Sequence, residues 1–303
     1  MIEHSPEIDQ ALANDQAVVA LETTLICQGL PRPANLDAAF EIERAVREAG
    51  AVPATIGIVD GRVKIGLDDG EIERLARDPD VMKCSTRDIS LAMALGRNGA
   101  TTVAATIHLA RRAGIRFMAT GGLGGVHRGG ETSLDISADI GELARSPSVV
   151  VCSGAKAILD LPRTVEALES HGIAIHGYRT NRLPGFYVSR TTISVPEIAS
   201  VDHARSLVRA HAELGWPGSI VIANPPPEDL ALSADDFEAV LAGAMDAADK
   251  ANIGGGDVTP FLLAHIAVAT GQGTVDLNRK LVIANARLAA EIAQGCGLEK
   301  IRN

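Results

Sequence analysis

The sequence predicts an α/β fold, in which a mostly parallel central sheet carries helices on both faces. Short apolar runs alternate along the chain with segments of helical periodicity, a pattern typical of parallel sheets. Hydrophobic residues make up 46% of the sequence and aromatic residues only 3%, which suits small aliphatic side chains packed between helices and a buried sheet. No linker rich in Gly, Ser or Pro divides the chain, so we expect one domain over residues 1–303.

The first expected elements are a strand, a helix and a hairpin. Residues 17–21 form a short apolar run that predicts a buried strand. Residues 35–49 place apolar side chains on one helical face, and Gly50 follows where a helix commonly ends. Asp60 and Gly61 separate two β-rich runs, residues 55–59 and 62–67, and a two-residue Asp-Gly loop is a strong hairpin signal.

The remaining elements continue the alternation. Strands are expected over residues 81–84, 115–120, 149–152, 173–178 and 219–223. Helices are expected over residues 70–77, 89–96, 102–113, 137–144, 164–170, 203–214, 234–249, 260–269 and 274–293. Residues 179–200 show little periodicity, which favours a lid or a subunit-contact loop.

Charge and cysteine content narrow the functional classes. With 28 Lys and Arg against 38 Asp and Glu, the formal charge of −10 argues against broad binding to nucleic acid or to anionic membranes. The four cysteines form no CxxC pair or zinc spacing, so we expect reduced cysteines in the core. No apolar run is long enough to span a membrane. These features predict a cytoplasmic globular protein.

Polar residues follow several predicted strands, at the sheet edge where α/β proteins bind ligands. Lys156 comes after the run 149–152 and three small residues. A partly desolvated lysine there can act as a neutral amine and form a Schiff base, although a solvated surface lysine is the common alternative. Glu22 ends the first apolar strand. It is a candidate general acid, or else a carboxylate that caps the next turn.

Two further segments could bind ions. The loop 121–130 contains six glycines, with His127 and Arg128 beside them; its backbone amides suit an anion, unless it is only a tight loop beneath another backbone. Asp135, Ser137 and Asp139 have the spacing and oxygen chemistry to hold Mg²⁺ or Mn²⁺ partly through waters. The alternative is that Ser137 caps a helix and Asp139 favours its dipole.

Taken together, these segments resemble the pseudouridine-5′-phosphate glycosidase family, also called the indigoidine synthase A-like family. The resemblance runs in order across nearly the whole chain. It is carried by residues 20–24, 50–56, 83, 87–88, 98–104, 119–128, 135–139, 151–160, 223–225 and 259–263.

The resemblance implies a role for individual positions and a trimeric assembly. Lys156 corresponds to the Schiff-base nucleophile, Glu22 to the proton donor, and Asp135 to the ligand of one Mn²⁺ per subunit, acting largely through waters. The implied substrate contacts are Lys83, Val103 through its backbone, Ser137, Ala138 and Asp139, with His127 near the phosphate and Thr120 and Asn285 near uracil. The family is homotrimeric.

The implied reaction is the reversible cleavage of the C–C glycosidic bond of pseudouridine 5′-phosphate to uracil and ribose 5-phosphate. A lysine is needed because this bond has no heteroatom leaving group to protonate, unlike an O-glycosidic bond. Two alternatives remain: a Schiff-base lyase or aldolase acting on another sugar phosphate, and a non-catalytic accessory protein of pigment biosynthesis. The sequence departs from the family at Gly256, where a lysine is expected, and fits it loosely over residues 178–195.

Overall fold

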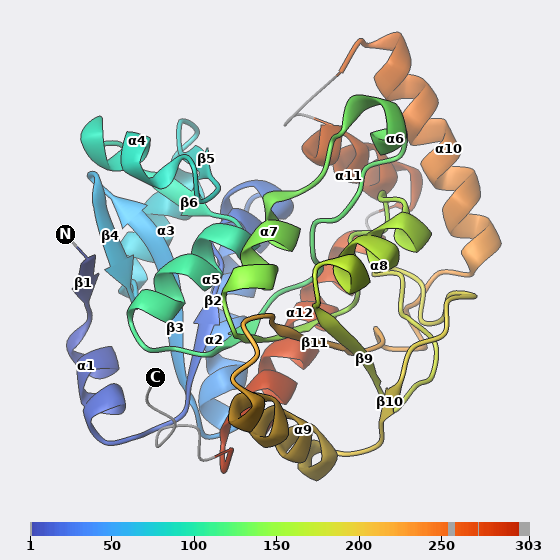
Figure 1. Ribbon diagram of the computed structural model, residues 1–303. Coiled ribbons are helices and arrows are strands. Elements are labelled where there is room, and N and C mark those ends of the chain that lie inside the picture. The colour runs from blue at the N-terminus through green and yellow to red at the C-terminus, as the bar shows by residue number, and fades with distance from the viewer. Residues whose placement is uncertain (1, 254–257, 272, 297–303) are drawn as a thin grey trace.

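The computed structural model describes residues 2–253, 258–271 and 273–296. Within them the strands form an 11-stranded sheet of order β1-β4-β3-β2-β7-β8-β11-β9-β10, with β6 joined to β3 and β5 joined to β6. Only the β3–β4 and β3–β6 pairs are antiparallel. Helices surround the sheet (Figure 1), so the predicted α/β fold with a mostly parallel sheet is confirmed.

The strands are short, as the apolar runs predict. They are β1 Ile2–His4, β2 Val18–Leu21, β3 Val52–Val59, β4 Arg62–Ile65, β5 Met82–Cys84, β6 Gly99–Thr101, β7 Phe117–Ala119, β8 Val149–Cys152, β9 Ala174–Tyr178, β10 Glu197–Ile198 and β11 Ile220–Ala223.

The helices connect the strands and cover them. They are α1 Pro6–Ala13, the π-helix η1 Leu25–Gly29, α2 Ala34–Glu48, α3 Asp69–Arg77, α4 Ile89–Ala94, α5 Val103–Arg112, α6 Gly130–Ser133, α7 Ala138–Arg145, α8 Leu161–Ser170, α9 Val201–Leu214, α10 Ala234–Lys250, α11 Val258–Ala269 and α12 Gly273–Ala293.

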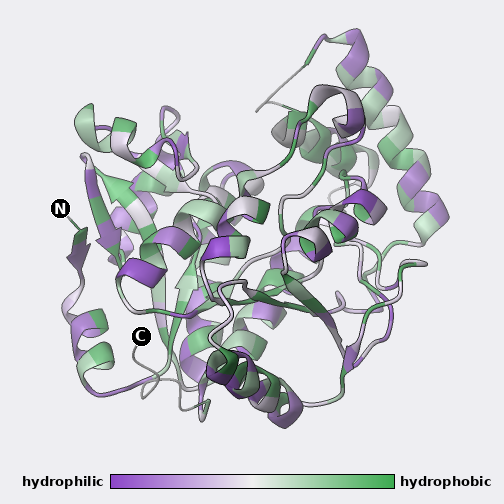
Figure 2. Ribbon diagram, viewed as in Figure 1, coloured by the Kyte–Doolittle hydropathy of each residue, from purple (hydrophilic) through white to green (hydrophobic). Residues whose placement is uncertain are grey.

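Strand β2 shows how the sheet is covered on both faces. Val19 and Leu21 pack in one core cluster with α2 and α12, whereas Val18 and Ala20 pack in a second cluster with α1 and α5. Successive side chains of a strand point to opposite faces, and both faces are apolar here. Figure 2 shows the same arrangement, with hydrophobic strands at the centre and hydrophilic residues on the outer sides of the helices.

Each element expected from the sequence has a counterpart, within a few residues at its ends. The Asp60-Gly61 turn joins β3 and β4, and both residues have positive φ, 49° and 73°. A two-residue hairpin loop that follows the right-handed twist of its strands needs this geometry, which favours Asp-Gly. The departure at Gly256 lies outside the described residues.

Several short elements were not expected. Strand β6, Gly99–Thr101, begins with Gly99 and Ala100, which are depleted in strands, and its pairing with β3 and β5 makes it a strand. Helix α1 did leave a sequence signal: Ser5 caps it through its side chain and Pro6 occupies the first turn. Local propensity therefore predicts the long elements, whereas a strand as short as β6 forms only because it pairs with its neighbours.

Residues 179–200, expected to form a lid or a subunit contact, lie partly in the core. Leu183, Phe186 and Tyr187 are buried, and the Phe186 N–H donates to the Ser153 carbonyl at 2.9 Å. The middle of this segment therefore packs against the end of β8. No helix within the described residues is long and apolar enough to cross a lipid bilayer.

The four cysteines are free thiols, and three of them, Cys84, Cys152 and Cys296, are buried. Cys27 is partly exposed, and its Sγ donates to the Leu75 carbonyl at 3.4 Å. The expectation of unpaired cysteines that pack as small apolar residues is confirmed for the three buried ones.

Candidate active site

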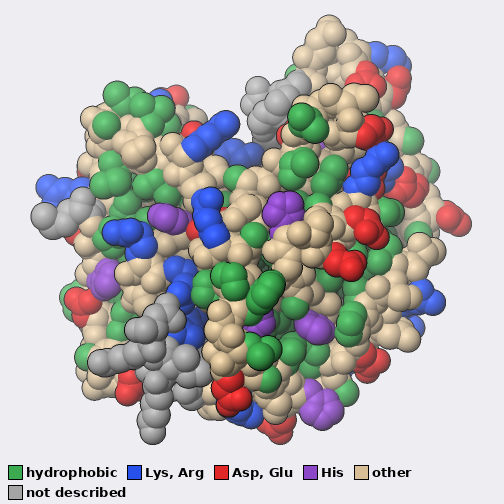
Figure 3. All heavy atoms as spheres, viewed as in Figure 1, with side chains coloured by type: hydrophobic (Ala, Val, Ile, Leu, Met, Phe, Trp, Pro, Cys, Tyr) green, Lys and Arg blue, Asp and Glu red, His purple; other side chains and the backbone are tan. Residues whose placement is uncertain are grey.

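A cleft lies at the carboxyl ends of strands β2, β5 and β7, where ligands bind in α/β sheets. It contains about 580 Å³ of space that no atom fills, part of it open to solvent. In the space-filling view the surface is hollowed between the side that carries α4 and β5 and the side that carries α10 and α11 (Figure 3). The lining residues include Glu22, Thr24, Leu25, Gln28, Lys83, Thr102, Thr120, Lys156, Phe186, Leu263 and Asn278.

Glu22 is the buried acid of the cleft. It follows β2, its side chain is 8% exposed, and the hydroxyls of Thr24 and Thr120 each donate to one of its carboxyl oxygens. Burial raises the pKa of Glu22, while the positive charge of Lys156 and the two hydroxyls act against that rise. The carboxyl group therefore keeps its proton to a higher pH than an exposed glutamate does, as a general acid requires.

Lys156 reaches the same cleft from the turn after β8. Gly154 makes this turn with φ +84°, and a Cβ there would lie 2.1 Å from the Pro184 carbonyl oxygen, so only glycine fits. The Lys156 N–H donates to the Leu123 carbonyl at 2.9 Å, which ties the lysine to the glycine-rich loop. The structure thus brings together Glu22 and Lys156, which are far apart in the sequence.

Asp139 holds the glycine-rich loop against helix α5. Its two carboxylate oxygens accept from the Gly124 N–H at 2.8 Å and from the Ala104 N–H at 2.9 Å, and the side chain is buried. A Cβ at Gly124 would lie 2.1 Å from the Ser137 Oγ, so the loop needs glycine for this close approach. Ser137 caps α7 by accepting from the Asp139 N–H at 3.2 Å, which confirms its capping role.

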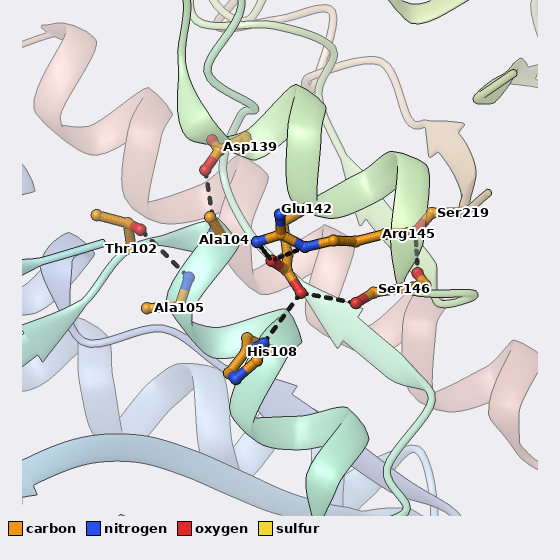
Figure 4. A network of polar contacts seen from close by, with 9 residues as sticks. All are labelled: Thr102, Ala104, Ala105, His108, Asp139, Glu142, Arg145, Ser146 and Ser219. Atoms are coloured by element: carbon orange, nitrogen blue, oxygen red, sulfur yellow. Dashed lines mark hydrogen bonds and ion pairs between the residues drawn. The ribbon is translucent and has the colours of Figure 1, made fainter. Parts of the chain in front are cut away.

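A second buried carboxylate, also on α7, supports this arrangement. Glu142, on α7, is 1% exposed and accepts from Arg145 and from the Ser146 hydroxyl, while the ring of His108 on α5 lies 3.3 Å away. Figure 4 shows Glu142 between α5 and α7, one helical turn from Asp139. Several polar contacts satisfy this buried charge, and they fix α7 so that Asp139 reaches the loop and α5.

The N-terminus of α5 faces the cleft. Thr102 is its N-cap and lines the cleft, and the Val103 N–H, at the first helical position, has no hydrogen-bond partner within the described part of the chain. Unpaired N–H groups at a helix N-terminus attract anions. This is the backbone group that the resemblance implies as a substrate contact.

His127 and Asp135 form a pair at the edge of the glycine-rich loop. The His127 Nδ1 lies 3.9 Å from an Asp135 carboxylate oxygen, and the His127 N–H donates to the Asp135 carbonyl at 3.0 Å. Burial lowers the pKa of His127, the Asp135 charge opposes this, and the charges of Lys156 and Lys83 add to it. Both lysines are thus close enough to affect the ring electrostatically.

Asp135 fits a metal ion only in a water-rich form. Its side chain is 44% exposed, and no group of three or more His, Cys, Asp or Glu side chains in the described ranges could hold a metal. A single exposed carboxylate suits Mg²⁺ or Mn²⁺ that keeps most of its waters. Of the three oxygen residues considered from the sequence, Asp139 is already engaged by two backbone amides.

Asn278 and Asn285 lie about two turns apart on α12 and have different surroundings. Asn285 is fully buried: its Nδ2 donates to the Thr120 carbonyl at 2.9 Å, and its Oδ1 accepts from the Asn224 Nδ2 at 3.0 Å. It joins the ends of β7 and β11 and does not line the cleft. Asn278 lines the cleft, is 4% exposed, and its Oδ1 has no partner among the described residues. Sequence reasoning selected Asn285 and missed Asn278.

Sequence reasoning also missed other cleft residues, among them Phe186, Gln28 and Leu263. Phe186 lies in the segment without periodicity and packs over Gly121 and Gly122, while Gln28 and Leu263 lie within η1 and α11. Phe186 has φ +63°, an uncommon conformation for a bulky residue that often marks a functional site. No sequence signal indicates this conformation, because the fold around it imposes it.

A buried carboxyl group with a raised pKa, an amine and several anion-binding groups therefore line one cleft. The acid can protonate a ligand oxygen, and the amine can attack an electrophilic carbon once it is neutral. Lys83 and the N-terminus of α5 can bind a phosphate nearby. This set suits a Schiff-base reaction on a phosphorylated sugar.

Two relatives named pseudouridine-5′-phosphate glycosidase are similar over nearly their whole length. The relative from Paracoccus denitrificans is 47% identical, covering 97% of both chains, and that from Herpetosiphon aurantiacus is 46% identical, covering 95% of this chain and 96% of its own.

Two solved structures are similar to this chain in fold and sequence. A prealnumycin C-glycosynthase in complex with ribulose 5-phosphate has a TM-score of 0.89 and 41% identity over 97% of this chain and 96% of its own. An indigoidine synthase A-like protein from Thermotoga maritima has a TM-score of 0.88 and 35% identity over 97% of this chain and 95% of its own. A model of the indigoidine synthase A like proteins matches residues 7–295. The chain belongs to the indigoidine synthase A like family.

Proposed function

We propose that this chain is a pseudouridine-5′-phosphate glycosidase, which cleaves the C–C bond between uracil and ribose 5-phosphate. The observation that carries the proposal is the pairing, in one cleft, of Lys156 with Glu22, whose pKa is raised by burial. The names of the relatives and the sugar phosphate bound to the C-glycosynthase support it.

The cleft residues suggest an order of steps. Glu22, protonated, donates its proton to the ribose ring oxygen, and the ring opens. The Lys156 amine bonds to C1′ in place of the ring oxygen, which gives a ring-opened amine adduct that still carries uracil. Protonation of uracil at C5 then allows the C1′–C5 bond to break: uracil leaves as a neutral molecule, and the nitrogen lone pair forms the iminium with C1′. Water adds to the remaining Schiff base, which releases ribose 5-phosphate and restores the lysine.

Substrate binding follows from the surroundings of the two catalytic groups. Lys83, His127 and the Val103 N–H offer donors and positive charge for the 5′-phosphate. Asn278 is suited to the base, because its unpaired Oδ1 can accept from a ring N–H of uracil. Ser137, Ala138 and Asp139 contribute by holding the loop in place around these groups.

A divalent ion, Mn²⁺ by family resemblance, would be held by Asp135 largely through waters. Such an ion supplies positive charge and bound water beside His127. We further propose a homotrimer that acts in the cytoplasm, and the four free cysteines suit a reducing compartment.

The test is direct. The protein is incubated with pseudouridine 5′-phosphate and Mn²⁺, and free uracil and ribose 5-phosphate are measured. Equal amounts of both products are expected, with uridine 5′-phosphate as the control substrate. Unphosphorylated pseudouridine should react far more slowly, because the anion-binding groups lose their ligand. Absence of uracil would exclude the proposed activity and favour a lyase or aldolase acting on another sugar phosphate.

A further inference from the structure

Two buried acceptors in the cleft lack hydrogen-bond donors. Within the described residues, four buried side-chain polar atoms have no partner: Gln28 Oε1, Ser85 Oγ, Arg205 Nε and Asn278 Oδ1. Two of these, on Gln28 and Asn278, belong to residues that line the cleft, and both are carbonyl oxygens. A buried acceptor without a donor is unfavourable, so these two positions are suited to donors supplied by a ligand.

The two acceptors belong to different parts of the cleft. The Gln28 Nε2 donates to the Val81 carbonyl at 3.4 Å, which places this carboxamide beside β5, the strand that carries Lys83. The Asn278 Oδ1 lies beside Gly121, 3.3 Å from where a Cβ of that residue would be. Gln28 therefore lies toward the phosphate-binding side, and Asn278 lies toward the end of β7.

Gln28 is presented by an unusual and well-anchored turn. It belongs to the π-helix η1, Leu25–Gly29, and single π-turns are rare and frequent at functional sites. The turn is fixed from both sides, since Asn35 Nδ2 donates to the Ile26 carbonyl at 2.7 Å and Cys27 Sγ donates to the Leu75 carbonyl at 3.4 Å. The Gln28 acceptor is thus held in place before a ligand binds.

We infer that the Gln28 side-chain oxygen accepts a hydrogen bond from a ribose hydroxyl, 2′ or 3′, and so makes the enzyme specific for ribonucleotides. The inference rests on the proposed function. The Gln28 amide nitrogen is already bonded to Val81, so the group presents only its acceptor. A phosphate offers no suitable proton near neutral pH, and the base lies toward Asn278. The sugar hydroxyls are the remaining donors.

The experiment compares the wild-type protein with Gln28→Met on three substrates: pseudouridine 5′-phosphate and its 2′-deoxy and 3′-deoxy analogues. The wild-type kcat/KM should fall about 10- to 100-fold for one of the two analogues, since one buried hydrogen bond is lost. Gln28→Met should lose a similar factor on the natural substrate and little more on that analogue. The analogue that shows this behaviour identifies which ribose hydroxyl, 2′ or 3′, Gln28 binds.

Asn278→Leu is the matched control, because it alters the other unpaired acceptor of the same cleft. This variant should lose activity yet keep the wild-type preference for the ribose. If Gln28→Met keeps that preference, or if wild-type protein turns over both analogues as fast as the natural substrate, the inference is wrong. The second of these results is measured on the wild-type protein alone, so it does not depend on whether the variant folds. A wild-type protein that releases no uracil overturns the proposed function itself.

Discussion

Thr120 donates a hydrogen bond from its side chain to Glu22, although 98 residues separate them. The contact exists because β2 and β7 are neighbours in the sheet, and each residue directly follows its strand. The Thr120 carbonyl in turn accepts from Asn285 on α12. The orientation of the proposed acid is therefore fixed by three elements of the fold.

Glu22→Gln should reduce the kcat for uracil release about 100- to 1000-fold, because glutamine keeps the shape but cannot donate an acidic proton. Burial raises the pKa of Glu22, so the wild-type kcat should fall as pH rises through a value above that of an exposed glutamate. The variant should lack this decline. Rates measured from about pH 5 to about pH 9 decide the point, and an unchanged profile would show that another group donates the proton.

Lys156 should be the residue that bonds to the sugar. Protein mixed with ribose 5-phosphate and borohydride should gain one sugar phosphate, which peptide mapping locates on Lys156, because borohydride reduces an iminium to a stable amine. Lys156→Ala should take up no label and lose turnover. Lys156→Arg should not restore it, since a guanidinium stays protonated. Label on another lysine would show that the nucleophile is misidentified.

Asp135→Ala should remove the dependence on Mn²⁺ while leaving the fold intact, because this side chain is 44% exposed and lies 3.9 Å from His127, too far for a strong ion pair. Metal binding by calorimetry and activity before and after EDTA treatment provide the two measurements. Glu131→Ala, at an exposed carboxylate of the neighbouring turn, is the control and should bind metal normally. A wild-type enzyme that is fully active in EDTA would argue against a metal at this position.

The two asparagines of α12 should separate binding from stability. Asn278→Leu should raise KM about tenfold with little loss of stability, because it removes an acceptor that has no partner in the protein. Asn285→Leu should lower the free energy of unfolding by about 2 kcal/mol or more, since it removes the partner of the Thr120 carbonyl and of the Asn224 Nδ2. Steady-state kinetics and denaturant unfolding of both variants are the measurements. The assignment is wrong if Asn278→Leu loses stability and Asn285→Leu only raises KM.

Glu43 should make stability depend on pH. This carboxyl group on α2 accepts from Thr55, and burial raises its pKa, with Asp69 and Glu7 adding to the rise and Arg47 opposing it. A raised pKa means that the folded state holds a proton that the unfolded state releases, so stability falls as pH rises from the unfolded pKa through the folded one. Glu43→Gln should lack this loss. Melting temperatures of both proteins should therefore diverge with increasing pH, and parallel curves would contradict the prediction.

The sequence by itself determined the alternating elements, the fold class and the two catalytic candidates. Buried parallel strands require continuous apolar runs such as residues 149–152, and these runs are visible without a structure. Because parallel strands end at a common edge, Glu22 and Lys156 could be selected as residues that follow such runs. The hairpin at Asp60-Gly61 was equally visible, since few residues tolerate its two positive φ angles.

Only the tertiary structure decided which polar groups face the cleft and which hold the fold together. Asn278 and Asn285 have the same side chain on the same helix, yet one is unpaired in the cleft and the other joins two strands. Asp139, a ligand candidate by spacing, binds two backbone amides from distant segments. Phe186 reaches the cleft from a stretch without periodicity because the end of β8 fixes its backbone. Such roles depend on contacts between residues far apart in the chain, and local sequence patterns carry no record of them.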